Sequence, residues 1–317
     1  EVSVALEPIA TGIAIKDPGV SLDGDADGQP GGAYDFWFRT AAPFGQAAVD
    51  EPKSLFVDKT TSSPGMGSLE APYADLQAAL LEAKPGDIVR VVANGGTDSS
   101  LLTGLDNIAY EIGINASLAG NDSLSDGEML QVGHGVTLMI DAGAIFKMRS
   151  AAVLIGSSAP GINRSGSALQ VLGTPTHPVV FTSFSDSSFG INSDPLGVVP
   201  EPGHWGGLLF SNVLDRAAGR FDYERQGIFL NHVNQAEIRY AGGEVEIDSV
   251  SQVVAPADLR ESRPTVAFNK ITHSADAAIT ATPNSFEELN FHAPLYQSTP
   301  FTSDYQRVGP DIHGNLL

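Results

Sequence analysis

The carboxylates near the start of this sequence are the residues whose spacing most clearly suggests chemistry. Residues 23–28 read Asp-Gly-Asp-Ala-Asp-Gly, so three aspartates alternate and a glycine allows a tight turn after the third. Calcium prefers six to eight oxygen ligands, and alternate aspartates can converge on one ion as the chain wraps around it. The pattern predicts a calcium site with the ligands Asp23, Asp25, Asp27, Gln29 and Asp35.

This loop departs from the EF-hand pattern at the last ligand. An EF-hand places a bidentate glutamate at position 12, whereas the loop has Tyr34 there and Asp35 one residue later. A full EF-hand is therefore not predicted, and an acidic turn without a metal remains the alternative. Two further acidic groups, residues 121–128 and the pair Asp186 and Asp194, could hold calcium but have no tight ligand pattern.

The overall charge narrows the classes of partner. The chain has 317 residues, with 38 acidic and 17 basic side chains and a net charge of -21. Such a surface repels phosphate backbones, so we expect no nucleic-acid partner, and it attracts divalent cations. The absence of cysteine excludes disulfides and thiolate metal sites. No apolar run reaches the length of a membrane span, so no membrane insertion is expected.

The elements that would position these residues are short strands. The 34 glycines and 20 prolines favour many turns and an all-β fold. From about residue 130 the chain alternates short apolar stretches with irregular loops, and two-residue hairpin turns such as Asn-Gly are scarce. The pattern favours stacked parallel rungs of roughly 20–25 residues over a sandwich of hairpins, because each short strand can bury its apolar side against its neighbours.

One amphipathic helix is predicted at about 73–84. Leu76, Ala79, Leu80 and Ala83 share one face of it, and a Pro-Gly pair follows its end. A coil of rungs would otherwise expose apolar core and unpaired backbone groups at its first rung. We therefore expect this helix to cover the N-terminal end of the coil.

Several of these segments resemble right-handed parallel β-helix proteins of the pectate-lyase-like superfamily. The similar stretches are the helix and following strand at 72–89 and the rung-like segments at 135–138, 142–144, 173–175, 178–183, 204–208 and 237–243. The resemblance covers about residues 52–317 and has the character of β-helix segments in large multi-module bacterial extracellular surface proteins. Residues 1–50 resemble the end of a preceding immunoglobulin-like or cadherin-like module. The resemblance implies a fold more than an activity, because the superfamily includes lyases, hydrolases, adhesins and structural stalks.

Two kinds of enzyme chemistry occur in that superfamily. Residues 133–135, Gly-His-Gly, are similar to a motif of polygalacturonases, but the aspartate cluster that supports inverting hydrolysis is missing, and a turn before a strand explains His134. A pectate-lyase-type reaction needs calcium and an arginine base. The candidate bases are Arg239, Arg260 and Arg263, and the candidate acids are Asp222, Glu224, Glu244, Glu246 and Asp248. The last three acids alternate along a predicted strand, so they could equally face solvent.

The sequence thus predicts an all-β protein in two parts. Residues 1–50 form a partial β-sandwich-like segment with the calcium loop, and residues 51–317 form a right-handed parallel β-helix with its capping helix. Because the chain begins at Glu1, we expect a mature product or an excised fragment of a secreted or cell-surface protein. Residues 311–317 look like the start of another strand, so the chain is expected to stop within its repeating architecture.

The expected function is structural or adhesive. The partners would be copies of the chain itself, associated head-to-tail, or further modules of a larger polypeptide. Two alternatives remain open: a lyase or hydrolase that acts on acidic polysaccharides, and a non-catalytic carbohydrate-binding module. In the binding module Trp205, Tyr223 and Tyr240 would stack on sugars if their rings formed an exposed row. No catalytic residue is assigned, and calcium is the one expected cofactor.

Overall fold

The computed structural model describes residues 52–61, 65–93, 108–115, 122–194, 196–226, 228–286 and 309–317. The chain divides into two compact units, Glu1–Arg39 and Thr40–Leu317, and all described residues belong to the second. The predicted segment of residues 1–50 therefore lies outside the described residues.

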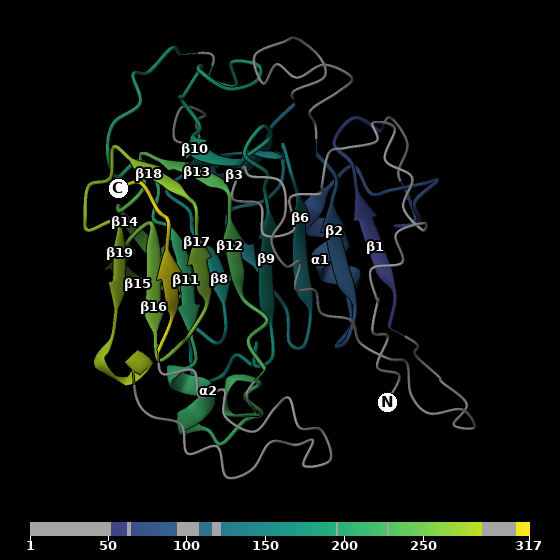
Figure 1. Ribbon diagram of the computed structural model, residues 1–317. Helices are drawn as coiled ribbons and strands as arrows, with labels where there is room; N and C mark the ends of the chain where they lie inside the picture. Colours follow the sequence, from purple (N-terminus) through teal and green to yellow (C-terminus); the bar gives the residue numbers. More distant parts are fainter. Residues whose placement is uncertain are drawn as a thin grey trace, which may run out of the picture. The chain divides into compact units, whose positions relative to one another are not determined.

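Most strands of the described residues lie in three largely parallel sheets, which confirms the all-β prediction (Figure 1). Sheet 1 consists, in spatial order, of β1 (Ser54–Val57), β2 (Ile88–Val91), β6 (Thr137–Asp141), β9 (Ala168–Leu172), β12 (His232–Asn234), β17 (Thr265–Ala267) and β20 (Asp311–His313). Sheet 2 consists of β18 (Lys270–Thr272), β13 (Ala236–Arg239), β10 (Val179–Ser183), β7 (Ile145–Arg149), β3 (Tyr110–Asn115) and the antiparallel β4 (Asp122–Ser123). Sheet 3 consists of β19 (Ile279–Ala281), β16 (Ala257–Arg260), β11 (Leu208–Ser211), β8 (Val153–Ile155) and β5 (Leu130–Gln131).

The chain visits the three sheets in turn. β6, β7 and β8 lie in sheets 1, 2 and 3, and β9, β10 and β11 repeat that order and pair in parallel with them. Each return to sheet 1 thus adds one coil to a stack. The coils are longer than the predicted 20–25 residues because loops extend from them. Residues in equivalent positions of successive coils are, for example, Thr137 and Ala168, or His232 and Thr265.

The core consists of side-chain ladders that repeat once per coil. In sheet 1 the register aligns the aliphatic residues Val57, Val91, Ile140, Val171, Val233, Val266 and Ile312. In sheet 2 the ring of Phe146 stacks on Tyr110 and Phe181, with ring centroids 5.2 and 5.0 Å apart. Trp205 extends this aromatic ladder, 6.4 Å from Phe181. Each coil therefore buries its apolar row against the coils before and after it, and this contact stabilises strands that are too short to be stable alone.

Tight corners join sheet 1 to sheet 2, and side-chain amides stabilise them. The residues with positive φ at this corner in three successive coils are Gln235 (51°), Phe268 (54°) and Gly314 (65°). Asn269 accepts a hydrogen bond from the backbone N–H of Ala236 and donates one to the carbonyl of Val233, both at 2.8 Å. Asn315 repeats this pattern one coil later, with the N–H of Asn269 at 2.9 Å and the carbonyl of Val266 at 2.7 Å. These amides satisfy backbone groups that the corner leaves open.

The helix α1 (Leu76–Glu82) packs against the first coils, as predicted, although it is shorter than residues 73–84. Leu76 and Ala79 are fully buried in the main core, and Asp75 caps the helix by accepting hydrogen bonds from two backbone N–H groups. The helix starts late because Tyr73 forms a parallel bridge with Val57 of β1.

The segment from Gly67 to Tyr73, which precedes α1, occupies the outer edge of β1. The N–H of Phe56 donates to the carbonyl of Gly67 at 2.9 Å, and the N–H of Tyr73 donates to the carbonyl of Phe56 at 2.8 Å. An edge strand with unpaired backbone groups would invite pairing with another chain. The segment from Gly67 to Tyr73 prevents this at β1.

None of the helices in the described residues combines the length and the apolar character that a bilayer crossing requires.

An antiparallel hairpin forms a second layer on the outer face of sheet 3. It consists of β14 (Glu244–Ile247) and β15 (Val250–Val253), joined by Asp248 and Ser249, which both have positive φ. Val245, Ile247 and Val254 pack there on a small apolar cluster with Leu154 and Leu209 of sheet 3. The remaining helices of the described residues are α2 (Val213–Ala217), η1 (Glu224–Gln226) and η2 (Pro283–Phe286).

Candidate functional site

The predicted calcium ligands Asp23, Asp25, Asp27, Gln29 and Asp35 all lie outside the described residues. Among the residues that are described, no group of three or more His, Asp or Glu side chains is arranged to hold a metal ion. The calcium site therefore stays a prediction.

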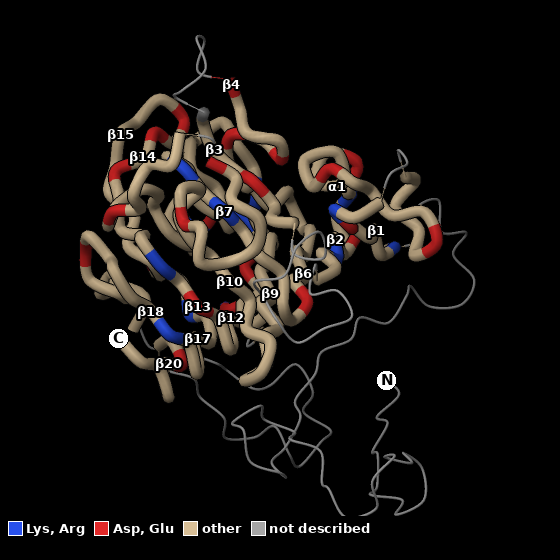
Figure 2. The backbone as a smooth tube through the Cα atoms, turned by 90° about the horizontal axis from the view of Figure 1, so that it is seen from above, with Lys and Arg blue, Asp and Glu red and all other residues tan. Residues whose placement is uncertain are grey.

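The other acidic groups contain carboxylates that bind cationic side chains of the protein itself. Asp126, in the acidic stretch 121–128, lies 2.5 Å from the Lys59 ammonium and is completely buried as a side chain. Asp186 lies 3.4 Å from the guanidinium of Arg239. Figure 2 shows Lys and Arg segments beside Asp and Glu segments around β7, β10 and β13, the region of the pair of Asp186 and Arg239. Asp126 and Asp186 thus hold loops against the coil, whereas Asp122 and Glu128 are exposed.

The loop after β10 is held in this way on the outer face of sheet 2. Lys147 of β7 is fully buried, and its ammonium donates to the carbonyl of Ile191 at 2.5 Å. Burial lowers the pKa of Lys147, and the charges of Asp186 and Glu111 oppose that shift. Arg239 of β13 also lies over the ring of Phe189, 5.1 Å from its centroid. These contacts fix the loop to the outer face of the sheet.

We expect Asp186→Asn to lower the free energy of unfolding at neutral pH by about 1–3 kcal/mol. Burial opposes ionisation of Asp186, but hydrogen bonds from Thr182 and Ser188 and the charge of Arg239 outweigh it and hold its pKa below the usual value. A carboxylate with a depressed folded pKa stabilises above its unfolded pKa of about 4, and this contribution is lost as the pH falls through the folded pKa. Urea unfolding should therefore show a difference in the free energy of unfolding between variant and wild type that is smaller at pH 3 than at pH 7.

The control for this variant is Asp248→Asn. Asp248 is exposed, and asparagine tolerates the positive φ at that position. This control should change stability by less than about 0.5 kcal/mol. Equal effects of the two substitutions would contradict a structural role for the Asp186 carboxylate.

The three arginines considered as lyase bases lie in three different environments. Arg239 binds Asp186 as described, and Arg260 binds Asp258 with Nη2 2.7 Å from the carboxylate. Arg263 is fully buried, and its Nε donates to the carbonyl of Ser285 at 3.0 Å. The structure does not bring these three side chains together around a shared group of acids.

The candidate acids also lie in different environments. Glu244, Glu246 and Asp248 are exposed on the hairpin, which agrees with their solvent-facing alternative. Asp222 and Glu224 are instead buried around Arg216: Arg216 Nε lies 2.7 Å from Asp222, and Nη2 lies 3.1 Å from Glu224. All three side chains are at most 5% exposed. Burial raises the pKa of Glu224, although the backbone N–H of Arg263 and the charge of Arg216 counteract this shift.

Two further sequence interpretations are resolved by the geometry. Val136 closes a turn onto the carbonyl of Gly133, and Gly135 has a φ of 65°, so turn geometry does explain His134. Two of the three aromatic residues considered for an exposed sugar-stacking row are buried. Trp205 is fully buried and donates from Nε1 to the carbonyl of Arg239 at 2.8 Å, and Tyr240 is only 9% exposed. Trp205 is buried because it extends the aromatic ladder of the core.

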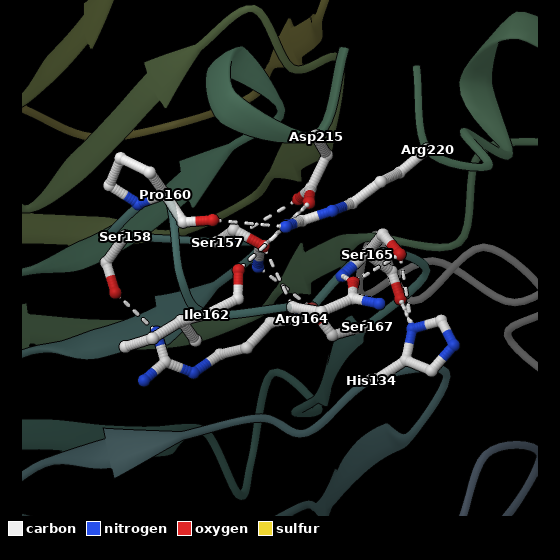
Figure 3. Close-up of polar contacts among 12 residues, drawn as sticks. His134, Ser157, Ser158, Pro160, Ile162, Arg164, Ser165, Ser167, Asp215 and Arg220 are labelled. Atoms are coloured by element: carbon white, nitrogen blue, oxygen red, sulfur yellow. Dashed lines mark hydrogen bonds and ion pairs between the residues drawn. The ribbon is translucent and has the colours of Figure 1, made fainter. Parts of the chain in front are cut away.

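Figure 3 shows a polar network between α2 and the turn after β8 that contains serine, histidine and aspartate. Asp215 accepts hydrogen bonds from Ser157 Oγ at 2.6 Å and from Arg220 Nη1 at 2.9 Å. His134 lies apart from Asp215 in this network, because its Nδ1 contacts the carbonyl of Ser165 at 2.6 Å. A nucleophilic triad requires the histidine between the serine and the carboxylate. This arrangement instead fixes α2 onto the coil.

A groove of about 210 Å³ lies beside this network. Its apolar walls come from Leu154 and Leu209 of sheet 3 and from Val213 and Leu214 of α2. Its polar residues are Ser157, Ser158, Ser211, Gln252 and Arg260. The sequence interpretation missed this groove, because its walls come from segments far apart along the chain.

The fold and the groove define a parallel β-coil protein with a small lateral cleft. Comparison with protein family models, with curated proteins and with solved structures gives no match for this chain.

Proposed function

We propose that this chain is an extracellular structural or adhesive element built as a right-handed parallel β-helix. The observation that supports the proposal best is the coil-to-coil register, which continues through seven strands of sheet 1 and is reinforced by the ladder of Asn269 and Asn315. Such a stack is a stiff scaffold, because each coil is stabilised by its direct neighbours. Its outward surfaces are then available for contacts with other molecules.

The experiment that separates this role from an enzymatic one is a turnover assay. The protein is incubated with pectate, alginate and sulfated glycans in the presence of calcium, and unsaturated products and new reducing ends are measured. We expect neither product above the buffer control. Sustained release from any of these glycans, lost in Arg260→Ala or Glu224→Gln, would overturn the structural role in favour of a lyase or hydrolase.

Self-association is the part of the proposal that sedimentation can test. Because the Gly67–Tyr73 segment already pairs with β1, a copy could add to that edge only after displacing it. Sedimentation velocity over a concentration series shows whether copies associate. Association that is unaffected by proline substitutions in β20 would contradict a head-to-tail contact through that strand.

Calcium is proposed as the ligand of the Asp23 loop. A ligand that binds only the folded form raises stability, by about 2.7 kcal/mol at a hundredfold excess over its dissociation constant. We expect a higher melting temperature with calcium than with chelator, and we expect the difference to disappear in the double variant Asp25→Asn and Asp27→Asn. The control is Asp122→Asn, an exposed residue of another acidic loop. Calorimetric titration that shows no heat in the wild type would contradict the site.

A further inference from the structure

The hairpin covers only part of the outer face of sheet 3. It leaves a strand-wide strip beside β15 uncovered by the described residues, and we call this strip the lane. β14 and β15 cover part of the outer face of this sheet, and the groove of about 210 Å³ lies beside β15, with Gln252 of that strand in its wall. On the far side of the groove lies α2 with Val213 and Leu214. The groove is therefore bounded by a strand edge on one side and by a helix on the other.

The register of the hairpin shows which backbone groups of β15 point into this lane. The two-residue turn makes Ile247 and Val250 a hydrogen-bonded pair, and the bond from the Val254 N–H to the Gly243 carbonyl continues the alternation. Ser251 and Val253 consequently direct their N–H and C=O groups away from β14. Among the described residues, these groups have no backbone partner.

The lane also has the side-chain character that an added strand requires. Its floor is aliphatic, so alternate side chains of an extended peptide could enter the groove, whose volume fits one or two of them. Val250 and Val253, which flank the open edge, are 60% and 50% exposed. β15 carries no charge and no proline, whereas natural edge strands are usually protected by such residues. The residues of β15 itself therefore give the edge no such protection.

Among the described residues, the side chain seen to contact this edge is that of Arg260. Arg260 Nη2 lies 3.4 Å from the carbonyl of Val253, a long contact, while the same guanidinium holds Asp258 at 2.7 Å. A peptide N–H could replace the long contact without disturbing the pair with Asp258. Arg260 is therefore compatible with an added strand.

Charge indicates the chemistry of the occupant. Glu244 and Glu246 of β14 and Asp248 of the turn are exposed, and the hairpin itself has no basic residue. Arg260, the cation that lines the groove, is paired with Asp258. A basic peptide is attracted to this surface, and a second copy of a chain with net charge -21 is repelled. We propose that β15 binds an extended segment of another protein in which aliphatic residues alternate with basic ones, by β-strand addition over the groove. This inference deepens the proposed adhesive role and rests on it.

The test uses a fluorescent, acetylated and amidated heptapeptide in which four lysines alternate with valine, leucine and valine. We expect saturable binding in fluorescence anisotropy, and in hydrogen exchange we expect the amides of Ser251 and Val253 to gain protection. A peptide with proline in place of the central leucine has the same charge but cannot pair along its length, and it should bind at least about tenfold more weakly. Equal binding of the two peptides would reduce the effect to charge attraction and overturn the proposal.

A matched pair of variants tests the edge itself. Ser251→Pro removes an N–H that points into the lane, whereas Ser251→Ala keeps this N–H and removes only the hydroxyl, which donates to Glu244. We expect at least about tenfold weaker binding for Ser251→Pro and a much smaller change for Ser251→Ala. Circular dichroism and melting of both variants show whether the hairpin still folds.

Ser211→Trp keeps the proposal testable if proline unfolds the hairpin. Ser211 lines the groove from β11, so tryptophan would fill the lane and leave β15 intact. Binding must then fall as well, and unchanged binding would overturn the proposal. Displacement of the peptide by oligogalacturonate, with no change at the amides of Ser251 and Val253, would assign the groove to a glycan instead. Peptide binding does not depend on the glycan turnover assay, so either proposal can fail alone.

Discussion

Phe146→Ala is expected to lower the free energy of unfolding by about 3–5 kcal/mol. Phe146 is fully buried and lies between the rings of Tyr110 and Phe181 in the aromatic ladder of sheet 2. In a stack of coils the space above and below a side chain is filled by its equivalents in the neighbouring coils. Truncation therefore leaves a cavity that touches two coils, and neither coil can close it without breaking its register.

The measurement is urea unfolding followed by far-ultraviolet circular dichroism. The control is Phe221→Ala, because Phe221 is 55% exposed and its ring packs edge-to-face against Tyr223. The control should change stability by about 0.5 kcal/mol or less. Similar values for the two variants would show that the aromatic ladder is not an important part of the core.

Arg216→Ala is the second substitution with a large expected effect, about 3–5 kcal/mol. Removing the guanidinium leaves the carboxylates of Asp222 and Glu224 buried without their shared cation. Ser262 Oγ and the backbone N–H of Arg263 still donate to Glu224, at 2.9 and 2.8 Å, but they carry no full positive charge. The loss of the cation therefore outweighs the hydrogen bonds that remain.

The loss of stability in Arg216→Ala should depend on pH in a defined direction. Burial already raises the pKa of Glu224, and removal of Arg216 raises it further. A carboxyl with a raised folded pKa favours folding below its unfolded pKa, and that advantage is lost as the pH rises through the folded pKa. The variant should therefore be closest to the wild type near pH 4 and furthest from it near pH 8.

Arg225→Ala is the matched control for this prediction. Its side chain is 53% exposed and 3.9 Å from Asp222, so it removes a charge from the same neighbourhood without uncovering a buried acid. We expect a change below about 1 kcal/mol. A larger effect for Arg225→Ala than for Arg216→Ala, or a variant gap that widens in acid, would contradict the assigned network.

The coil and its capping helix could be predicted because each depends on a local pattern. Four-residue apolar stretches separated by polar turns indicated short stacked strands, and the shared face of Leu76 and Ala79 indicated an amphipathic helix. The hairpin β14–β15 was missed because Asp248 and Ser249 form its turn in place of the usual Asn-Gly. Helix α2 was missed because five residues are too few to show a period of 3.6.

Burial of polar side chains limited the prediction of the candidate site. Asp222, Glu224 and Arg216 have the types expected on a surface, and only the packing of a distant turn around Ser262 shows that they lie inside. Trp205 misled in the opposite direction: an aromatic beside glycines looked available to sugars but belongs to the core ladder. The groove left no sequence signal, because its walls come from β8, β11, α2, β15 and β16.

Because the Gly67–Tyr73 segment pairs with the outer side of β1, we expect the stack to fold in one direction. The backbone groups on the outer side of β1 are already hydrogen-bonded to Gly67 and Tyr73. The first coil can therefore act as a template for further strands only on its other side. A newly made chain would thus lay down each later coil on the one before it, and an error in register would persist through all the coils added afterwards. Pausing or slowing synthesis near β6 should for that reason be tolerated better than deleting residues 67–73, which would leave the outer side of β1 unpaired.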